Sequence, residues 1–213
     1  MRIVGFLTAL GIPLFLLGFC TTPDIVPIQA EQTWGEKVAA AAESIIDSDI
    51  LYDPAYVKIP YPNGDVDPKT GVCTDVVIRT YRKLNIDLQK LVHEDMKDHF
   101  EEYPNNWGLN STDSNIDHRR VPNLMTFFER KGKIKSKSLR AEDYKAGDIV
   151  AWDLGSGILH IGIVSNNSMN GGLKKKVIHN IGNGQIEEDV LFNWKIIGIY
   201  TVSYTHLTLP TKA

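Results

Sequence analysis

The chain has 213 residues, of which 43% are apolar and 23% are charged, a composition typical of an ordinary globular protein with one or two domains. This excludes a disordered chain, a collagen-like chain and a disulfide-dense mini-protein. The 26 acidic residues outnumber the 23 basic ones and give a formal charge of −3. Nucleic-acid binding favours a strongly basic domain or face, so bulk charge does not predict it, and we expect no nucleic-acid partner.

The first thirty residues have the pattern of an export signal. An apolar run over residues 3–19 follows the basic Arg2. The run is short for a membrane span, which needs about 20 apolar residues, and it fits the charged-then-apolar plan of a secretory signal. Ala30 offers a small residue for cleavage, and Cys20 leaves lipidation open. We expect residues 1–30 to be a signal peptide or N-terminal anchor, and the domain to reach the periplasm or cell envelope.

The cysteine count follows from this prediction. The chain has two cysteines, Cys20 and Cys73, and only Cys73 lies outside the N-terminal segment. Disulfides are permitted in an exported protein, yet Cys73 would have no internal partner. It is therefore either a small buried apolar residue or a reactive thiol.

Helical patterns occupy the first part of the domain. Apolar residues recur there at helical spacing in four segments. The first segment follows a capping box of Thr33 and Glu36, and the second begins at Cys73. The third runs over residues 87–100, and the fourth begins near Pro122. A loop rich in Pro, Gly and Asp separates the first two helices over residues 53–71.

Strand patterns occupy the second part of the domain. Residues rich in Ile and Val, separated by Gly, Asn and Ser turns, predict strands over residues 148–153, 158–165, 176–181 and 195–201. Helices first and strands later predict an α+β fold with an antiparallel sheet. Gly182-Asn183-Gly184 is expected to be a turn between strands, because no helix follows it.

The end of the chain is unusual. Residues 202–213 resemble a translated sequencing adapter. We therefore expect a domain over residues 31–201, followed by a non-native tail that contributes nothing to fold or activity.

Cys73 is the candidate nucleophile. It opens a predicted helix directly after Gly71-Val72. Free N–H groups at a helix N-terminus stabilise a thiolate and can hold an oxyanion as the thiolate attacks a carbonyl. The sequence therefore predicts an accessible thiol with a lowered pKa.

Two histidines are candidates for the base and its orienting group. His160 lies in a strongly apolar strand, and His179 lies in the next strand. Adjacent strands could place both rings on one face, with His160 toward the thiol and His179 behind it. A metal site of Cys73, His160 and His179 is the weaker alternative, because the sequence has no short-range ligand pair such as CxxC or HExxH. We expect no metal and no cofactor.

These residues carry a resemblance to a known family. Tyr61-Pro62-Asn63-Gly64 with Cys73 twelve residues after the tyrosine, residues 146–150 followed by His160-Ile161-Gly162-Ile163-Val164, and Val177-Ile178-His179 resemble the motifs of NlpC/p60-like cysteine peptidases. Residues 117–124 resemble a bacterial domain of unknown function in the same papain-like superfamily. The resemblance implies N-terminal helices packed on a C-terminal antiparallel sheet. It also implies a Cys73 nucleophile, a His160 base, a polar orienting group at His179, and hydrolysis of peptidoglycan stem peptides.

The sequence departs from that family beside the nucleophile. Val72 stands where the family has Asp, and Thr74-Asp75 stand where it has Ser-Gly, so the walls of the site differ. We expect Asp75 to line the substrate site and Tyr61 to lie beside Cys73, holding the oxyanion or the substrate carbonyl. The cluster of Asp117 with His118, Arg119 and Arg120 is either a carboxylate-binding site or a structural salt-bridge cluster or helix cap.

The leading functional hypothesis is an exported cysteine hydrolase that cleaves an amide bond in peptidoglycan. One alternative is an acyl hydrolase or acyltransferase of the same fold that acts on another acyl donor. Another is a non-catalytic envelope binding module. In each case we expect membrane association only through the N-terminal segment.

Overall fold

The helices expected in the first part of the domain are present in the computed structural model, which describes residues 31–169, 171 and 174–208. They are α1 (Trp34–Glu43), α2 (Cys73–Lys83), α3 (Leu88–Asp98) and α4 (Val121–Lys131). Short 3₁₀ segments are η1 (Phe100–Glu102), η2 (Asp117–Arg119) and η3 (Ala141–Asp143). The expected signal peptide or anchor, residues 1–30, lies outside the described residues.

Local capping explains where two of these helices begin. The Thr33 hydroxyl accepts the N–H of Glu36 at 3.3 Å, and the Glu36 carboxylate accepts the N–H of Thr33 at 2.7 Å. The predicted capping box at the start of α1 is therefore confirmed. Pro122 lies in the first turn of α4, where its missing N–H has no intrahelical partner to lose.

The sheet is antiparallel throughout and has the order β3-β8-β4-β5-β6-β7. Its strands are β3 (Lys133–Ile134), β4 (Ile149–Asp153), β5 (Leu159–Met169), β6 (Lys174–His179), β7 (Ile186–Glu188) and β8 (Lys195–Thr201). The α+β class with an antiparallel sheet is confirmed, and the four expected strands are β4, β5, β6 and β8. The short edge strands β3 and β7 carry too few residues to show a periodic pattern in the sequence.

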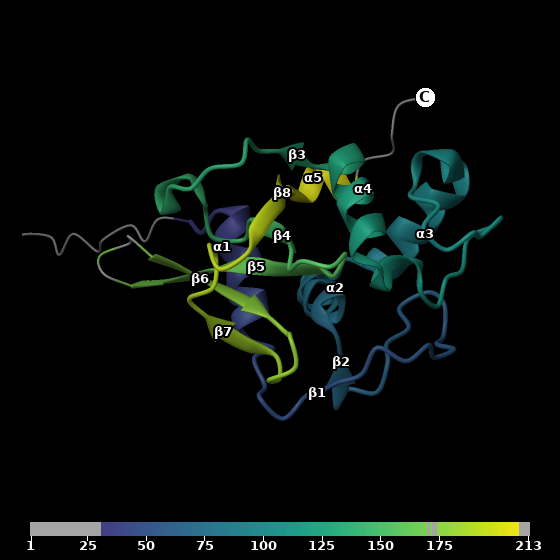
Figure 1. Cartoon of the computed structure of the whole chain (residues 1–213), viewed down its shortest axis with the longest axis horizontal. Helices are drawn as coiled ribbons and strands as arrows, with labels where there is room; N and C mark the ends of the chain where they lie inside the picture. Colours follow the sequence, from purple (N-terminus) through teal and green to yellow (C-terminus); the bar gives the residue numbers. More distant parts are fainter. Residues whose placement is uncertain (1–30, 170, 172–173, 209–213) are drawn as a thin grey trace, which may run out of the picture. The chain divides into compact units, whose positions relative to one another are not determined.

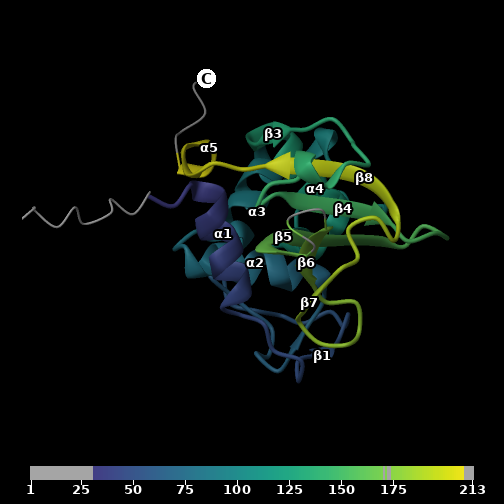
Figure 2. The same ribbon diagram turned by 90° about the vertical axis from the view of Figure 1, so that its left-hand side faces the viewer.

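One face of the sheet is covered by helices (Figures 1 and 2). Helices α1, α2 and α4 all contact β5. Ile161 and Ile163 point toward this face and join a buried cluster with Val38 of α1 and Val76 of α2. This layer positions the first residue of α2 against β5.

The opposite face is covered by loops. Val164 and Trp152 point to this side and pack with Tyr144, Leu191 and Trp194 from the segments beside the sheet. Because successive side chains of a strand point to opposite faces, His160 belongs to this loop-covered face and Ile161 to the helix-covered face.

The segment after β8 is part of the fold. Val202 and Leu207 are buried in the helix-side cluster, and Tyr204 of α5 (Tyr204–Thr208) packs edge-on against Trp34 with ring centroids 5.4 Å apart. The expectation that residues from 202 onward contribute nothing to the fold is therefore wrong for this segment, because Val202 and Leu207 bury apolar surface in the helix-side cluster and Tyr204 packs against Trp34 of α1. Residues 209–213 lie outside the described residues.

Within the described part of the chain, no helix combines the length and the apolar character needed to cross a membrane.

A further pair of strands lies next to the start of α2. The two-residue strands β1 (Leu51–Tyr52) and β2 (Thr70–Gly71) pair in parallel, with Tyr52 opposite Gly71. This pair was not expected, since both segments fall in or beside a loop rich in Pro and Gly. The pairing places Tyr52 opposite Gly71, which precedes Cys73 by two residues.

Candidate functional site

Cys73 lies where two strands of the sheet part. Strands β5 and β6 pair at Ile163–Ile178, and the pairs that would continue this register, Gly162 with His179 and Ile161 with Asn180, are absent. The Asn180 side-chain amide instead donates to the carbonyl of Gly71 at 3.3 Å. The start of α2 therefore occupies the gap between β5 and the end of β6.

The backbone N–H of Ile161 points to the Cys73 sulfur. Val164 donates its N–H to the carbonyl of Asp148, the residue just before β4, so by alternation the N–H of Ile161 points to the side of β6, where its strand partner is missing. That N–H, together with those of Thr74 and Cys73 itself, favours the thiolate and lowers the pKa of Cys73. The sulfur thus sits among several backbone donors.

Burial outweighs these donors. Cys73 is only 4% exposed, and desolvation raises the pKa of its thiol to about 12, with the nearby Asp75 carboxylate adding to the rise. The expectation of an accessible thiol with a lowered pKa is therefore wrong for the protein in this state. A charged sulfur in an apolar surrounding costs more than the neighbouring N–H groups recover.

His160 and His179 form the pair that the strand pattern predicted. Their rings share one face of the sheet, and Nε2 of His160 lies 2.8 Å from Nδ1 of His179. Nε2 of His179 lies 3.0 Å from the Glu188 carboxylate. Trp152 and Trp194 pack against the rings. The result is a chain of contacts from the buried rings of His160 and His179 to the partly exposed carboxylate of Glu188.

This chain fixes the tautomers of both rings. Burial lowers the pKa of His160 to about 3, and burial also lowers the pKa of His179, although the Glu188 carboxylate opposes it. Both rings are therefore neutral at pH 7. Glu188 accepts only from a protonated Nε2 of His179, so His179 Nδ1 accepts from His160 Nε2–H. His160 Nδ1 is left with a free lone pair, as a proton acceptor requires.

The thiol and the imidazole approach the sheet from different sides. Cys73 belongs to the helix-side cluster, and the His160 ring packs on the loop-covered face. Among the described residues, no hydrogen bond joins the Cys73 sulfur to the His160 ring. The Cys73 sulfur instead contacts the backbone beside His160, because it accepts the N–H of Ile161, the residue after His160.

The tyrosine near Cys73 is Tyr52 and not Tyr61. The Tyr61 ring packs on His93 of α3 with centroids 5.1 Å apart, and its pKa is raised by burial and then by the carboxylates of Glu94 and Asp87. Burial raises the pKa of Tyr52, and Cys73 contributes to that rise. The expected placement of Tyr61 beside Cys73 is therefore corrected, because its loop runs along α3.

Asp75 and Arg119 form a buried bidentate ion pair. Nε and Nη2 of Arg119 lie 2.9 and 3.0 Å from the two carboxylate oxygens of Asp75. Asp75 also accepts the N–H of Val72 at 2.7 Å, and Thr74 donates its hydroxyl to the carbonyl of Arg119 at 3.1 Å. Both side chains are committed to holding the start of α2, so neither is placed to bind substrate as expected.

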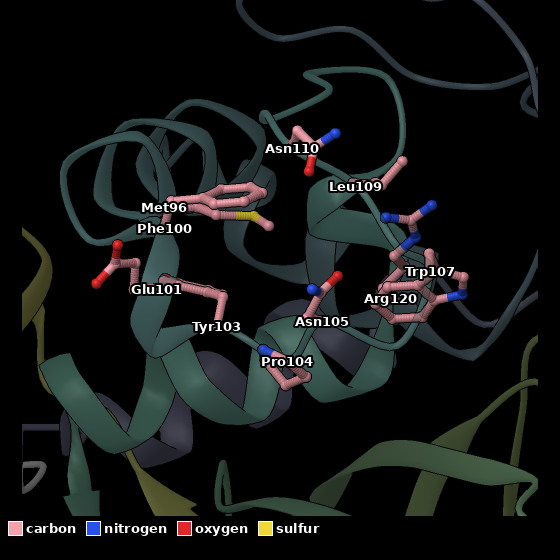
Figure 3. A pocket seen from close by; sticks show the side chains of 10 residues that line it. All are labelled: Met96, Phe100, Glu101, Tyr103, Pro104, Asn105, Trp107, Leu109, Asn110 and Arg120. Carbon is pink, nitrogen blue, oxygen red and sulfur yellow. The ribbon is translucent and has the colours of Figure 1, made fainter.

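His118 and Arg120 have separate surroundings. His118 is 1% exposed, and burial followed by the charge of Arg119 lowers its pKa to about 3, so it is a neutral interior side chain and not the expected substrate ligand. Arg120 points elsewhere, with its guanidinium carbon 4.0 Å from the ring centroid of Trp107 at the edge of a pocket (Figure 3). The polar cluster is thus divided between the interior and a pocket.

Glu188 and Tyr52 were not anticipated from the sequence. Glu188 lies opposite Val177 in the hairpin that follows Gly182-Asn183-Gly184, two positions from the pairing of His179 with Ile186. Counting the strand register outward from that turn would have placed the Glu188 side chain on the same face of the sheet as His179. Tyr52 gave no local signal, because only the parallel pairing with β2 brings it near Cys73.

Over the residues that the structure describes, no group of three or more His, Cys, Asp or Glu side chains is arranged to hold a metal ion.

Sequence comparison assigns the chain to a family. Residues 39–202 match the family described as a domain of unknown function, DUF1287. The chain belongs to this family. It is 53% identical over 178 residues to the uncharacterized protein YijF of Escherichia coli strain K12, an alignment that covers 84% of this chain and 85% of YijF.

Proposed function

We propose that this DUF1287 protein is an exported cysteine hydrolase, related to the NlpC/p60-like papain superfamily, that cleaves an amide bond in peptidoglycan stem peptides. One observation carries the proposal. The first residue of α2 is a cysteine whose sulfur meets the backbone next to His160, and the His160 ring is held by His179 and Glu188. A nucleophile, a base with a free lone pair and an orienting chain are the parts that thiol catalysis needs.

The proposed reaction has two steps. His160 Nδ1 takes the thiol proton as the Cys73 sulfur bonds to the substrate carbonyl carbon, and the backbone N–H groups at the start of α2 hold the oxyanion. The C–N bond breaks, the amine leaves with the proton from His160, and a thioester remains. Water then gives its proton to His160 and breaks the S–C bond, which releases the acid and restores the thiol.

The resting pair is neutral in this proposal. A thiol with a raised pKa transfers its proton to the neutral His160 imidazole only when the two groups come together, so the thiolate forms during attack and not before it. Catalytic hydrogen bonds are often long in unliganded enzymes and tighten when substrate binds. Substrate binding is expected to bring the thiol and His160 Nδ1 together.

The burial of Cys73 also favours a second candidate, a non-catalytic envelope binding module. A thiol that is 4% exposed and has no hydrogen bond to His160 would suit a protein that kept the fold without the reaction. The two candidates differ in whether substrate is consumed.

Digestion of purified muropeptides, read by mass spectrometry, tests the proposal. The full chain should release a fragment of defined mass, and Cys73→Ala should release none. His160→Ala should lower turnover by roughly 100- to 10,000-fold, the usual contribution of a general base. His99→Ala, an exposed histidine outside the site, is the matched control and should retain full activity.

A positioning role for Glu188 has its own readout. Glu188→Gln should lower turnover less than His160→Ala does and should shift the pH profile of kcat, since it changes the tautomer balance of the histidine pair.

Binding of intact muropeptides without cleavage by the wild type would support the binding module and reject the hydrolase. Transfer of the acyl group to an added amine in place of water would identify an acyltransferase.

A further inference from the structure

A pocket of about 460 Å³ lies between the end of α3 and the start of α4, outside the Cys73 site. Its walls come from the end of α3, from η1 and from the loop that leads to η2. Phe100, Pro104 and Leu109 supply apolar surface, and Asn105, Asn110 and Arg120 supply polar groups. A concave site with apolar walls and a few converging polar groups is the usual form of a small-ligand site.

Arg120 is the cationic group among the residues that line this pocket, and its guanidinium has no hydrogen-bonding partner among the described residues. Among the described residues, its guanidinium makes no hydrogen bond or ion pair, and its Nη1 atom is buried without an acceptor. It lies instead on the ring of Trp107. A guanidinium has five N–H donors, and a buried donor without an acceptor is costly, so this group has unused capacity for an anion.

The polar groups of the pocket face a common space. Figure 3 shows the Arg120 guanidinium over Trp107 on one side and Met96 with Phe100 on the other, with Asn105 and Asn110 between them. The carboxylate of Glu101, which also lines the pocket, points away from these groups. An anionic group at Arg120 would therefore have amide side chains beside it and apolar surface beyond it.

We propose that this pocket binds a carboxylate-bearing peptide end, with Arg120 as the carboxylate ligand and Trp107 as the surface that holds the guanidinium flat. The planar fork of an arginine matches the two oxygens of a carboxylate. The proposal rests on the proposed function for the choice of a stem peptide, whose ends and side chains carry carboxylates. It assigns to Arg120 the carboxylate-binding role that the sequence left open for the cluster of Asp117, His118, Arg119 and Arg120.

The charge around Arg120 favours a carboxylate over a phosphate. Burial lowers the pKa of Arg120, and the carboxylates of Asp117 and Asp113 lie near enough to oppose that shift, although neither hydrogen-bonds to it. Asp113 is bonded to Tyr56 and Asn115, and Asp117 to the N–H of Asp113. One guanidinium with two acidic neighbours suits a singly charged ligand better than a phosphate dianion, which their field would repel.

The pocket and the Cys73 site share one short segment. Arg119 turns inward to Asp75 at the start of α2, and the next residue, Arg120, turns outward to the pocket. A ligand held at Arg120 is therefore anchored to the same backbone that accepts the hydroxyl of Thr74, next to the thiol. This connection would let the pocket position one end of a substrate relative to Cys73.

Binding of N-acetyl-D-alanyl-D-alanine and of its C-terminal amide tests the proposal. Isothermal titration calorimetry uses the full chain carrying Cys73→Ala, so that no turnover interferes. The acid should bind at least about tenfold more tightly than the amide, the ratio expected for one charge-assisted hydrogen bond. Arg120→Gln should remove this preference, and Arg120→Lys should reduce it, because lysine lacks the planar fork.

Two further variants keep the result interpretable. Arg140→Gln changes an exposed arginine away from the pocket and should leave both affinities unchanged. Asn110→Asp introduces a negative charge beside Arg120 and should also remove the preference for the acid. This variant tests the proposal even if Arg120→Gln fails to fold. Equal binding of acid and amide, no binding of either, or a preference that survives all Arg120 and Asn110 changes would overturn the proposal.

Competition with inorganic phosphate separates the two anion classes. Phosphate that displaces the peptide at equal or lower concentration would also overturn the proposed carboxylate site.

The proposed pocket and the proposed reaction can fail independently of each other. An Arg120-dependent acid preference without Cys73-dependent cleavage keeps the pocket and rejects the hydrolase. Cleavage that depends on Cys73, without any acid preference, keeps the hydrolase and rejects the pocket.

Discussion

At the scale of single residues, the protonation of Cys73 is set by burial. The free N–H groups at the start of α2 and the N–H of Ile161 favour the thiolate, but the sulfur has almost no contact with water. Desolvation therefore decides the direction of the pKa shift. A helix N-terminus alone is a poor predictor of reactivity when the same residue faces the core.

Alkylation of Cys73 by iodoacetamide tests this conclusion. In a Cys20→Ser background, the rate at pH 8 should be at least about tenfold slower than for free cysteine, whose pKa is about 8.5. The rate should rise only well above pH 9, because the pKa of the thiol is raised to about 12. Cys73→Ala in the same background gives the blank, and a midpoint at or below that of free cysteine would contradict the argument.

At the scale of elements, the Asp75–Arg119 pair joins α2 to η2. The two residues are 44 positions apart, and both side chains are almost fully buried. The two charges of the pair compensate each other, and the Asp75 carboxylate also accepts the N–H of Val72 just before the nucleophile. Its expected role is to fix where α2 begins.

Removing one partner of this pair should destabilise the protein strongly. Arg119→Ala leaves the Asp75 carboxylate buried without its cation, which costs about 3–5 kcal/mol. The effect of Asp75→Asn should not add to it, because both changes break one interaction. Urea unfolding measures both. Arg140→Ala, which breaks an exposed pair with Glu142, should cost less than about 1 kcal/mol.

The short helix α5 offers a second test at this scale. Leu207 is buried in the helix-side cluster and Leu139 is 87% exposed, so the same substitution should have different effects at the two positions. Leu207→Ala should cost at least about 2 kcal/mol and lower Tm by about 4 °C or more. Leu139→Ala should leave Tm within error. Truncation after Thr201 should act in the direction of Leu207→Ala, and an unchanged Tm would restore the view that the tail lies outside the fold.

At the scale of the whole molecule, buried neutral histidines should make stability fall in mild acid. The pKa values of His118 and His160 are lowered to about 3 in the folded protein, against about 6.5 in an unfolded chain. Below pH 6.5 the unfolded state therefore binds protons that the folded state does not. The contribution of these two neutral histidines to the free energy of unfolding is complete above about pH 6.5 and is lost as the pH drops toward 3.

Urea unfolding at pH 7.5 and 5.5 measures this loss. Each of the two histidines should lower the free energy of unfolding by about 1.4 kcal/mol per pH unit below 6.5. Asp117, whose pKa is raised by burial, acts with the opposite sign. Comparison of His118→Asn with His99→Asn isolates the histidine contribution. The difference between the two pH values should shrink in the first variant and stay constant in the exposed control.

The sequence by itself determined those features that depend on neighbours along the chain. The capping box of Thr33 and Glu36 and the helix that opens at Cys73 involve spacings of three or four residues. The strands follow from runs of Ile and Val, and the meeting of His160 with His179 follows from adjacent strands of an antiparallel sheet. The order of helices and strands was enough for the α+β class. The roles of the paired residues in catalysis stay predictions.

Only the tertiary structure decided which polar side chains are committed and which are free. Arg119 and Arg120 are equivalent in the sequence, yet one meets Asp75 in the interior and the other lies on Trp107 beside a pocket. Tyr52 replaces Tyr61 near the thiol, and burial reverses the expected pKa shift of Cys73. The physical reason is common to all of these. Desolvation and ion pairing depend on groups brought together from distant parts of the chain, and local spacing carries no information about them.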